Sequence, residues 1–221
     1  DQIYLFGPDT YKAYEFDGET GDARGSFSLE TTYRIPDVWN PTDYYAFYPK
    51  ELFAGYNFID GSFLLGSEIP QIQEYQRGSY DNDTNTMIGF SQDNRNFMFQ
   101  NILGYLRVSI KGDMCVRNIE LQSNGSETLS GMFSFAADDI NSLDWYDNKK
   151  ETIKIDCGKQ GVQLSDTPTD FYFVMMPGEY ADGISLTLNF TDDTTFTKST
   201  SNSITIKRNT IQPMSVFKVG D

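Results

Sequence analysis

The chain has 221 residues and carries 32 acidic against 17 basic side chains, a formal net charge of −15. This excess of acid excludes sequence-independent binding to nucleic acid or to anionic lipid, because both need basic groups that neutralise phosphate. Apolar residues make up 38% of the chain and aromatic residues 15%, enough for the core of one large or two small domains. No apolar run approaches the ~20 residues of a membrane span.

The sequence contains no histidine. Ser-His-Asp triads, Cys-His pairs and zinc sites with histidine ligands are therefore excluded. The two cysteines, Cys115 and Cys157, are too few for a disulfide framework or a zinc knuckle. Their spacing leaves two alternatives open, a single bridge or two small buried thiols.

Apolar and polar residues alternate with the period of two that is typical of half-buried strands, and long stretches with a helical period are missing. In the first half of the chain this pattern predicts strands over residues 3–6, 14–16, 25–29, 44–48 and 86–90. Polar stretches at residues 76–85 and 91–96 predict exposed loops. We place a domain boundary at the second loop, which gives one domain of residues 1–95 and another of residues 96–221.

The second half alternates more regularly and predicts strands over residues 106–110, 119–121, 133–135, 153–155, 184–190 and 204–206. Turn-forming residues separate these strands at spacings typical of an antiparallel sandwich. Residues 171–176 are apolar on both faces of an extended chain, which predicts a central strand covered on both sides. The sequence therefore predicts an all-β protein.

Two acidic segments are candidate metal or catalytic sites. Residues 81–85 resemble the start of a calcium loop, but Thr86 and Gln92 stand where that motif needs glycine and glutamate. We expect a solvated loop here. A second acidic cluster could gather at short helical spacing, although a solvated face is expected; its members are Asp138, Asp139, Asp144 and Asp147.

No catalytic motif stands out. A serine-hydrolase elbow and a phosphate-binding glycine loop are missing, and no spacing singles out one carboxylate pair for glycoside hydrolysis. The sequence predicts no enzyme, no cofactor and no metal site. Trp39 and Trp145 are candidate sugar contacts, because a pyranose face stacks on an exposed aromatic ring; most tyrosines are expected to form cross-strand or core-edge contacts.

Several segments, in order along the chain, resemble the fimbrillin family of Bacteroides-type bacteria. They are residues 45–49, 69–73, 87–91, 99–112, 116–121, 171–177 and 204–209, followed by Ile211 and Met214. The resemblance covers nearly the whole chain and implies two tandem transthyretin-like antiparallel β-sandwich domains. It also implies export to the outer-membrane surface through a lipidated precursor segment that is absent here. Partners would be other fimbrial subunits, or a host surface protein or glycan.

Members of this family that form pili add a strand of one subunit to the groove of another, which implies a partner-strand groove near the C-terminal strands. The expected groove residues alternate along the chain; they are Ile204, Ile206, Ile211, Met214 and Val216. Only seven residues follow Met214, which favours a tip, anchor or stand-alone adhesin as much as a shaft subunit. Residues 193–195 resemble the short O-glycosylation motif of these bacteria, with Thr194 as the acceptor. The alternative function is a surface carbohydrate-binding module that uses Trp39 and Trp145.

Overall fold

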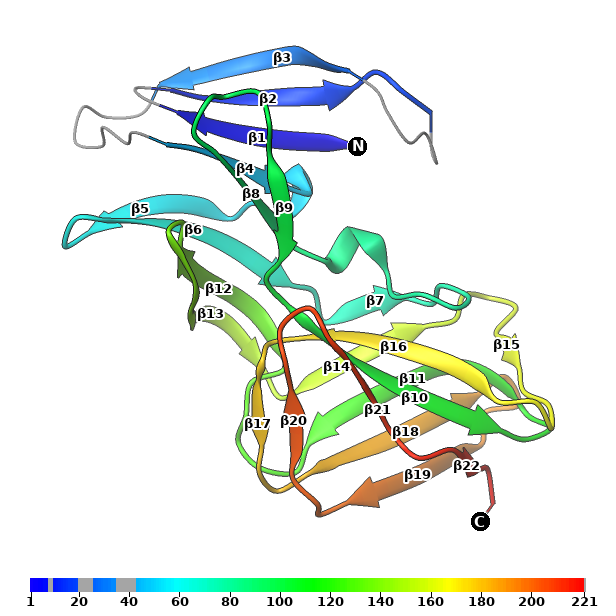
Figure 1. Cartoon of the computed structure of the whole chain (residues 1–221). Helices are drawn as coiled ribbons and strands as arrows, with labels where there is room; N and C mark the ends of the chain where they lie inside the picture. The colour runs from blue at the N-terminus through cyan, green and yellow to red at the C-terminus, as the bar shows by residue number, and fades with distance from the viewer. Residues whose placement is uncertain (8–9, 20–25, 35–42, 221) are drawn as a thin grey trace. The chain divides into compact units, whose positions relative to one another are not determined.

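The computed structural model describes residues 1–7, 10–19, 26–34 and 43–220 (Figure 1). This part of the chain folds as strands and two short 3-10 turns and contains no α-helix, so the predicted all-β class is confirmed. Contacts divide the chain into two compact units. Unit 1 comprises Asp1–Ser67, Thr86–Ile102 and Phe133–Asp144, and unit 2 comprises Glu68–Asn85, Leu103–Met132 and Trp145–Asp221. A domain boundary between residues 95 and 96 stays a prediction.

Unit 1 contains a six-stranded antiparallel sheet whose order is β3-β2-β1-β4-β8-β9. Its strands are β1 (Gln2–Gly7), β2 (Thr10–Phe16), β3 (Phe27–Arg34), β4 (Tyr44–Tyr48), β8 (Met87–Ser91) and β9 (Met98–Asn101). A second sheet has the order β13-β12-β6-β5. Its strands are β5 (Gly55–Ile59), β6 (Ser62–Ile69), β12 (Ser130–Ala136) and β13 (Asp139–Lys150). The 3-10 turn η1 (Lys50–Leu52) follows β4.

Aromatic rings form much of the core of unit 1. The ring of Phe6 on β1 lies 5.5 Å from that of Phe63 on β6, so the two sheets meet through aromatic contacts. Tyr11 and Tyr33 are directly opposite each other on β2 and β3, and their rings stack 4.6 Å apart. The expectation that tyrosines form cross-strand contacts is confirmed for this pair.

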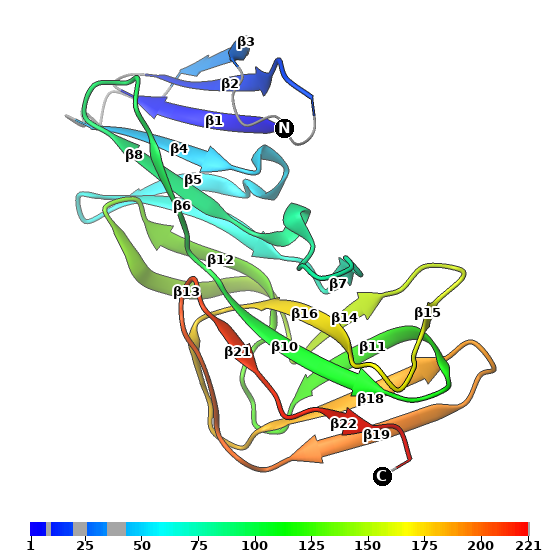
Figure 2. The same cartoon turned by 45° about the vertical axis from the view of Figure 1, so that its right-hand side comes forward.

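Unit 2 is built on two sheets and a separate pair of short strands (Figures 1 and 2). The first has the order β19-β18-β11-β14-β7, and β15 also pairs with β11. Its strands are β7 (Ile72–Glu74), β11 (Cys115–Ser123), β14 (Thr152–Asp156), β15 (Val162–Gln163), β18 (Ile184–Phe190) and β19 (Thr195–Thr200). The second has the order β16-β10-β21, with β22 also on β10, and β17 and β20 form a separate pair. These strands are β10 (Gly104–Lys111), β16 (Thr169–Met175), β17 (Gly178–Tyr180), β20 (Ile204–Ile206), β21 (Ile211–Pro213) and β22 (Phe217–Lys218).

The period-two runs of the second half supply the core of unit 2. Fully buried side chains alternate along β10, β11 and β18; they include Leu106, Val108, Ile110, Ile119, Leu121 and Leu188. The predicted strands containing these residues are confirmed. β10 begins at Gly104, where a Cβ atom would collide with the backbone carbonyl of Lys207. Only glycine allows this close approach of the two chain segments.

The segment of residues 171–176 differs from its prediction in one respect. It forms most of β16, and Phe171, Phe173 and Val174 have no exposed surface, so coverage on both faces is confirmed. However, β16 lies at an edge of its sheet, next to β10 alone, and the prediction of a central strand was wrong. The amide side chain of Gln73 covers this edge, which explains how an edge strand is buried.

The polar stretch of residues 76–85 is not wholly exposed, and the prediction of a solvated loop was wrong for its second half. Asp81 and Asn85 are buried, at 7% and 4% exposure. The Asp81 carboxylate accepts hydrogen bonds from the backbone N–H groups of Glu74 and Asp83. It caps the 3-10 turn η2 (Asn82–Thr84), because a short side-chain acceptor satisfies backbone donors that a turn leaves unpaired.

The aspartates of the acidic cluster at residues 138–147 are all exposed, so the expected solvated face is confirmed and the alternative of helical spacing is not. These residues lie mainly along β13, an extended strand, where successive side chains point to opposite faces. In the described part of the chain no group of three or more Cys, Asp or Glu residues is placed to hold a metal ion.

Candidate functional site

A half-open groove of about 590 Å³ runs along one side of unit 2. In both views β19 and β22 lie along this side (Figures 1 and 2), and the rings of Phe196 and Phe217 on these strands are 6.3 Å apart. We call this feature the C-terminal groove. Its lining comprises Ile184, Leu186, Lys198, Ser199, Thr200, Asn202, Ser203, Ile204, Thr205, Gln212, Pro213, Met214, Ser215, Val216 and Phe217.

The walls of the C-terminal groove differ in their hydrogen bonding. β19 is an edge strand that pairs with β18 alone, so one row of its backbone N–H and C=O groups faces away from its sheet. On the other wall β21 and β22 pair in parallel with β10, and residues 214–216 between them belong to no strand. The groove therefore combines an open strand edge with an irregular apolar wall.

The structure brings together three of the five predicted groove residues. Ile204, Met214 and Val216 line the C-terminal groove, and Val216 is 50% exposed. Ile206 is only 2% exposed and belongs to the core. Ile211 is 45% exposed but does not line the groove. Whether any of the five contacts a partner strand stays a prediction.

Lys198 is a groove residue that the sequence analysis did not identify. It is opposite Leu186 in the pairing of β19 with β18, and its ammonium lies 5.9 Å from the centre of the Phe217 ring. An inward-pointing charge on an edge strand hinders indiscriminate pairing with other strands. The alternation of Phe196, Lys198 and Thr200 was the available signal, because these three residues share one face of a strand.

On the opposite side of unit 2, part of the β16 edge is satisfied by a side chain of the same chain. Gln73 on β7 has no exposed surface, and its side-chain amide forms two hydrogen bonds of 2.9 Å with the backbone of Val174 on β16. The amide nitrogen donates to the Val174 carbonyl, and the amide oxygen accepts from the Val174 N–H. At Val174, one side chain thus replaces the pairing that a neighbouring strand would give.

Of the two residues predicted as sugar contacts, only Trp145 lies within the described part of the chain. Trp39 lies outside the described residues. Trp145 is half-buried on β13 and does not line the C-terminal groove. Neighbouring Tyr146 is 48% exposed.

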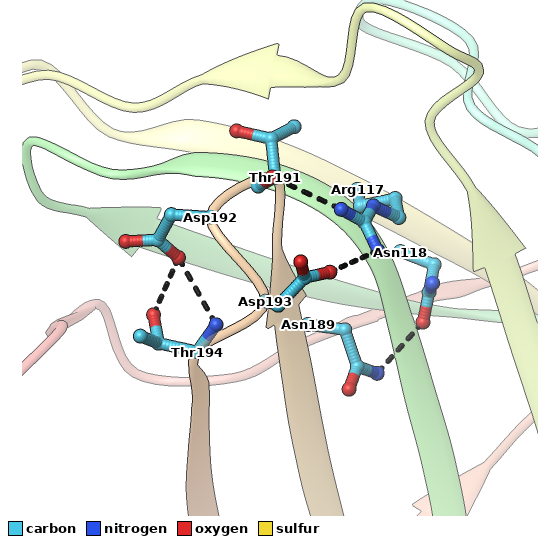
Figure 3. A network of polar contacts seen from close by, with 7 residues as sticks. All are labelled: Arg117, Asn118, Asn189, Thr191, Asp192, Asp193 and Thr194. Carbon is cyan, nitrogen blue, oxygen red and sulfur yellow. Dashed lines mark hydrogen bonds and ion pairs between the residues drawn. The ribbon is translucent and has the colours of Figure 1, made fainter.

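Thr194, the predicted O-glycosylation acceptor, lies in the exposed turn between β18 and β19 (Figure 3). Its hydroxyl and its backbone N–H both donate to the Asp192 carboxylate, at 2.6 Å and 3.1 Å. These bonds hold the pKa of Asp192 below its usual value. The neighbouring Asp193 forms an ion pair of 2.9 Å with Arg117, whose guanidinium also donates to the Thr191 carbonyl. The turn is therefore ordered and its hydroxyl is at the surface; glycosylation of Thr194 stays a prediction.

Cys115 and Cys157 are free thiols, and both are partly buried. Cys115 donates a hydrogen bond to the carbonyl of Gln160. Burial raises the pKa of the Cys157 thiol to about 12, with a smaller contribution from the negative charge of Asp156. A thiol with this pKa is protonated at neutral pH and is a weak nucleophile, which does not favour a catalytic role.

No model of a protein family and no curated protein matches the chain. Several solved structures are similar to it in fold, and two of them are as follows. A candidate cell adhesion protein from Bacteroides ovatus is 14% identical, with a TM-score of 0.59 over 99% of this chain and 81% of that one. A candidate cell adhesion protein from Bacteroides uniformis is 12% identical, with a TM-score of 0.50 over 98% of this chain and 85% of that one. At these identities the likeness shows a shared fold. Within the described residues, no helix has the length and apolar character needed to cross a membrane.

Proposed function

We propose that the chain is a non-enzymatic, fimbrillin-like surface adhesin or fimbrial subunit that binds an extended strand of a partner protein in the C-terminal groove. The observation that carries this proposal is the groove itself, an open β19 edge facing an apolar wall. The two solved structures of similar fold are described as candidate cell adhesion proteins, which supports adhesion as the class of function.

Strand addition gives affinity through main-chain hydrogen bonds and specificity through pockets for alternate side chains. β19 offers an edge of six residues, from Thr195 to Thr200. A strand beside it would place every second side chain against Ile204, Met214 and Val216 in the groove. We expect the partner to carry a carboxylate or another strong acceptor near Lys198, because a strand that covers this ammonium removes it from water.

The finer features of the proposal rest on the fimbrillin resemblance. They are two tandem transthyretin-like β-sandwich domains, export as a lipidated precursor, and display at the outer membrane or within a fimbrium. The two units support a two-domain organisation, because the six-stranded sheet β3-β2-β1-β4-β8-β9 lies wholly within unit 1 and the sheets built on β10 and β11 lie wholly within unit 2. The partner would be another fimbrial subunit or a host surface protein.

Selection from a random library of twelve-residue peptides displayed on phage tests the proposal. The purified chain is the target, and a variant with Val216→Arg is used to remove peptides that bind elsewhere. We expect the selected peptides to alternate apolar and polar residues and to include an acidic residue. Val216→Arg should weaken binding of the synthetic peptides at least tenfold.

Ile211→Arg is the matched control, because Ile211 is equally exposed in the same C-terminal segment but does not line the groove. This variant should bind the peptides as the unaltered chain does. Failure to select any peptide that distinguishes Val216→Arg from the unaltered chain would contradict strand binding in the groove.

A further inference from the structure

A second hollow of unit 2 lies away from the C-terminal groove and has a different chemical character. Its volume is about 640 Å³, within the range of small-molecule sites. Three chain segments line it: the residues that follow β7, β15 with its flanking residues, and the start of β16. We call it the Tyr75 hollow. The lining residues used below are Tyr75, Arg77, Gln163, Thr167, Thr169 and Asp170.

The polar groups of the Tyr75 hollow are of both kinds, donor and acceptor. Arg77 supplies guanidinium donors and Asp170 supplies carboxylate acceptors, so the two formal charges cancel. They form no ion pair with each other. Hydroxyl groups of Thr167 and Thr169 lie in the same lining. In a chain with a net charge of −15, this is a neutral site rich in hydrogen-bonding groups.

Tyr75 provides an aromatic surface within this polar setting. Its side chain is half-buried, and its ring lies 5.2 Å from that of Phe171. Burial raises the pKa of the Tyr75 phenol; the charge of Arg77 opposes this shift and that of Asp170 adds to it. The Tyr75 ring, Arg77 and Asp170 thus line the same hollow.

The lining is held in place before any ligand binds. The Gln163 amide donates to the carbonyls of Asp113, Met114 and Leu164. The Asp170 carboxylate accepts a hydrogen bond from the Ser109 hydroxyl on β10. Preorganised groups bind a ligand without a further cost of ordering.

Arg77 is the exception, because its guanidinium makes no ion pair or hydrogen bond with any residue in the described ranges. It projects from a tight turn closed by a bond from the Ser79 N–H to the Gln76 carbonyl, with Gly78 at a φ of 74°. This conformation suits glycine at the third position of the turn. The turn places the donors of Arg77 in the lining of the hollow while leaving them available.

We propose that the Tyr75 hollow binds a sugar residue of a glycan. A pyranose ring carries an apolar face and several hydroxyl groups that each donate and accept. The apolar face fits the Tyr75 ring, and hydroxyl groups between Arg77 and Asp170 bond to both side chains. A hydrophobic ligand would leave these polar groups desolvated and without partners. A polyanion would be attracted by Arg77 but repelled by the carboxylate of Asp170. The site does not depend on strand binding in the C-terminal groove.

Saturation-transfer NMR with the purified chain tests this proposal. The probes are D-galactose, D-mannose, N-acetyl-D-glucosamine and N-acetylneuraminic acid at millimolar concentration, each followed by a titration if it binds. At least one should bind. Arg77→Gln and Asp170→Asn should each weaken its binding tenfold or more, and Tyr75→Phe should weaken it less because the ring is kept.

Arg95→Gln is the matched control, since it makes the same chemical change in an exposed residue of unit 1. It should leave sugar binding unchanged, and so should Val216→Arg in the C-terminal groove. Thermal unfolding of each variant verifies that it is folded. Absence of binding by all four sugars would overturn the proposal. Equal binding by Arg77→Gln, Asp170→Asn and the unaltered chain would overturn it as well, as would loss of binding in Val216→Arg alone.

Discussion

Two edge strands of unit 2, β16 and β19, differ in whether another part of the chain pairs with their outer backbone groups. On one side the edge strand β16 is sealed by Gln73, whose amide pairs with the N–H and C=O groups of Val174. On the other side the edge strand β19 faces the C-terminal groove, and no segment of the described chain pairs with its outer edge. An edge that the chain satisfies itself contributes to stability, whereas an edge left open is available for binding.

The side chains on the two sides differ accordingly. The sealed side buries a polar residue, Gln73, with no exposed surface, and buries Asp81 nearby in the sequence. The open side exposes apolar residues, of which Val216 is 50% exposed. Buried polar groups are tolerated only when they are hydrogen-bonded. Apolar side chains that are exposed to water gain free energy of burial when a partner covers them. Gln73 and Asp81 therefore contribute to the stability of the fold, whereas Val216 is available to a partner.

The largest expected effect distinguishes two apolar residues of the C-terminal segment. Ile206→Asp should destabilise unit 2 by more than about 4 kcal/mol, because it places a carboxylate at a site only 2% exposed. Val216→Asp should change the free energy of unfolding by less than about 1 kcal/mol, because that side chain is at the surface. Urea unfolding followed by tryptophan fluorescence measures both. If the two variants were equally destabilised, Val216 would belong to the core and not to an open groove.

A smaller loss of stability is expected when the Gln73 side chain at the β16 edge is removed. Gln73→Ala leaves the N–H and C=O groups of Val174 without their partners, which should cost about 3 kcal/mol. Gln71→Ala is the matched control two residues earlier, where an exposed amide donates to the Thr152 hydroxyl at 2.9 Å. Gln71→Ala should lower the free energy of unfolding by less than about 1 kcal/mol. Equal unfolding midpoints for the two variants would show that the Gln73 amide does not seal the β16 edge.

Most strands of unit 2 could be predicted from the sequence, because alternation within one strand is a local signal. β18 shows this well, since Ile184, Leu186 and Leu188 alternate and all three are buried. The position of a strand within its sheet is not a local property. Residues 171–176 are apolar on both faces, yet β16 is an edge strand, because the covering group comes from Gln73, about a hundred residues earlier in the chain.

The candidate sites were predictable only in part for the same reason. Alternation identified Ile204, Met214 and Val216, which do line the C-terminal groove, but it also selected Ile206, which faces the core. The Tyr75 hollow could not be predicted, since its lining joins segments near residues 77, 163 and 169. Only long-range pairing, such as that of β7 with β14, brings these segments together.

The smallest expected effect on stability is at the turn that begins β19 on the open side. Thr194→Ala removes one exposed hydrogen bond to Asp192 but keeps the bond from the Thr194 N–H. It should change the free energy of unfolding by less than about 0.5 kcal/mol. If Thr194 carries a glycan, chain produced in a Bacteroides host should lose that mass in the variant. Thr195→Ala, which keeps Asp193 and Thr194, should retain it. Intact-mass spectrometry distinguishes these outcomes. If both variants differ from the unaltered chain only by the mass of the Thr-to-Ala change, modification at Thr194 is excluded. Because the variant stays folded, a lost glycan reports on the acceptor itself and not on the structure of the turn.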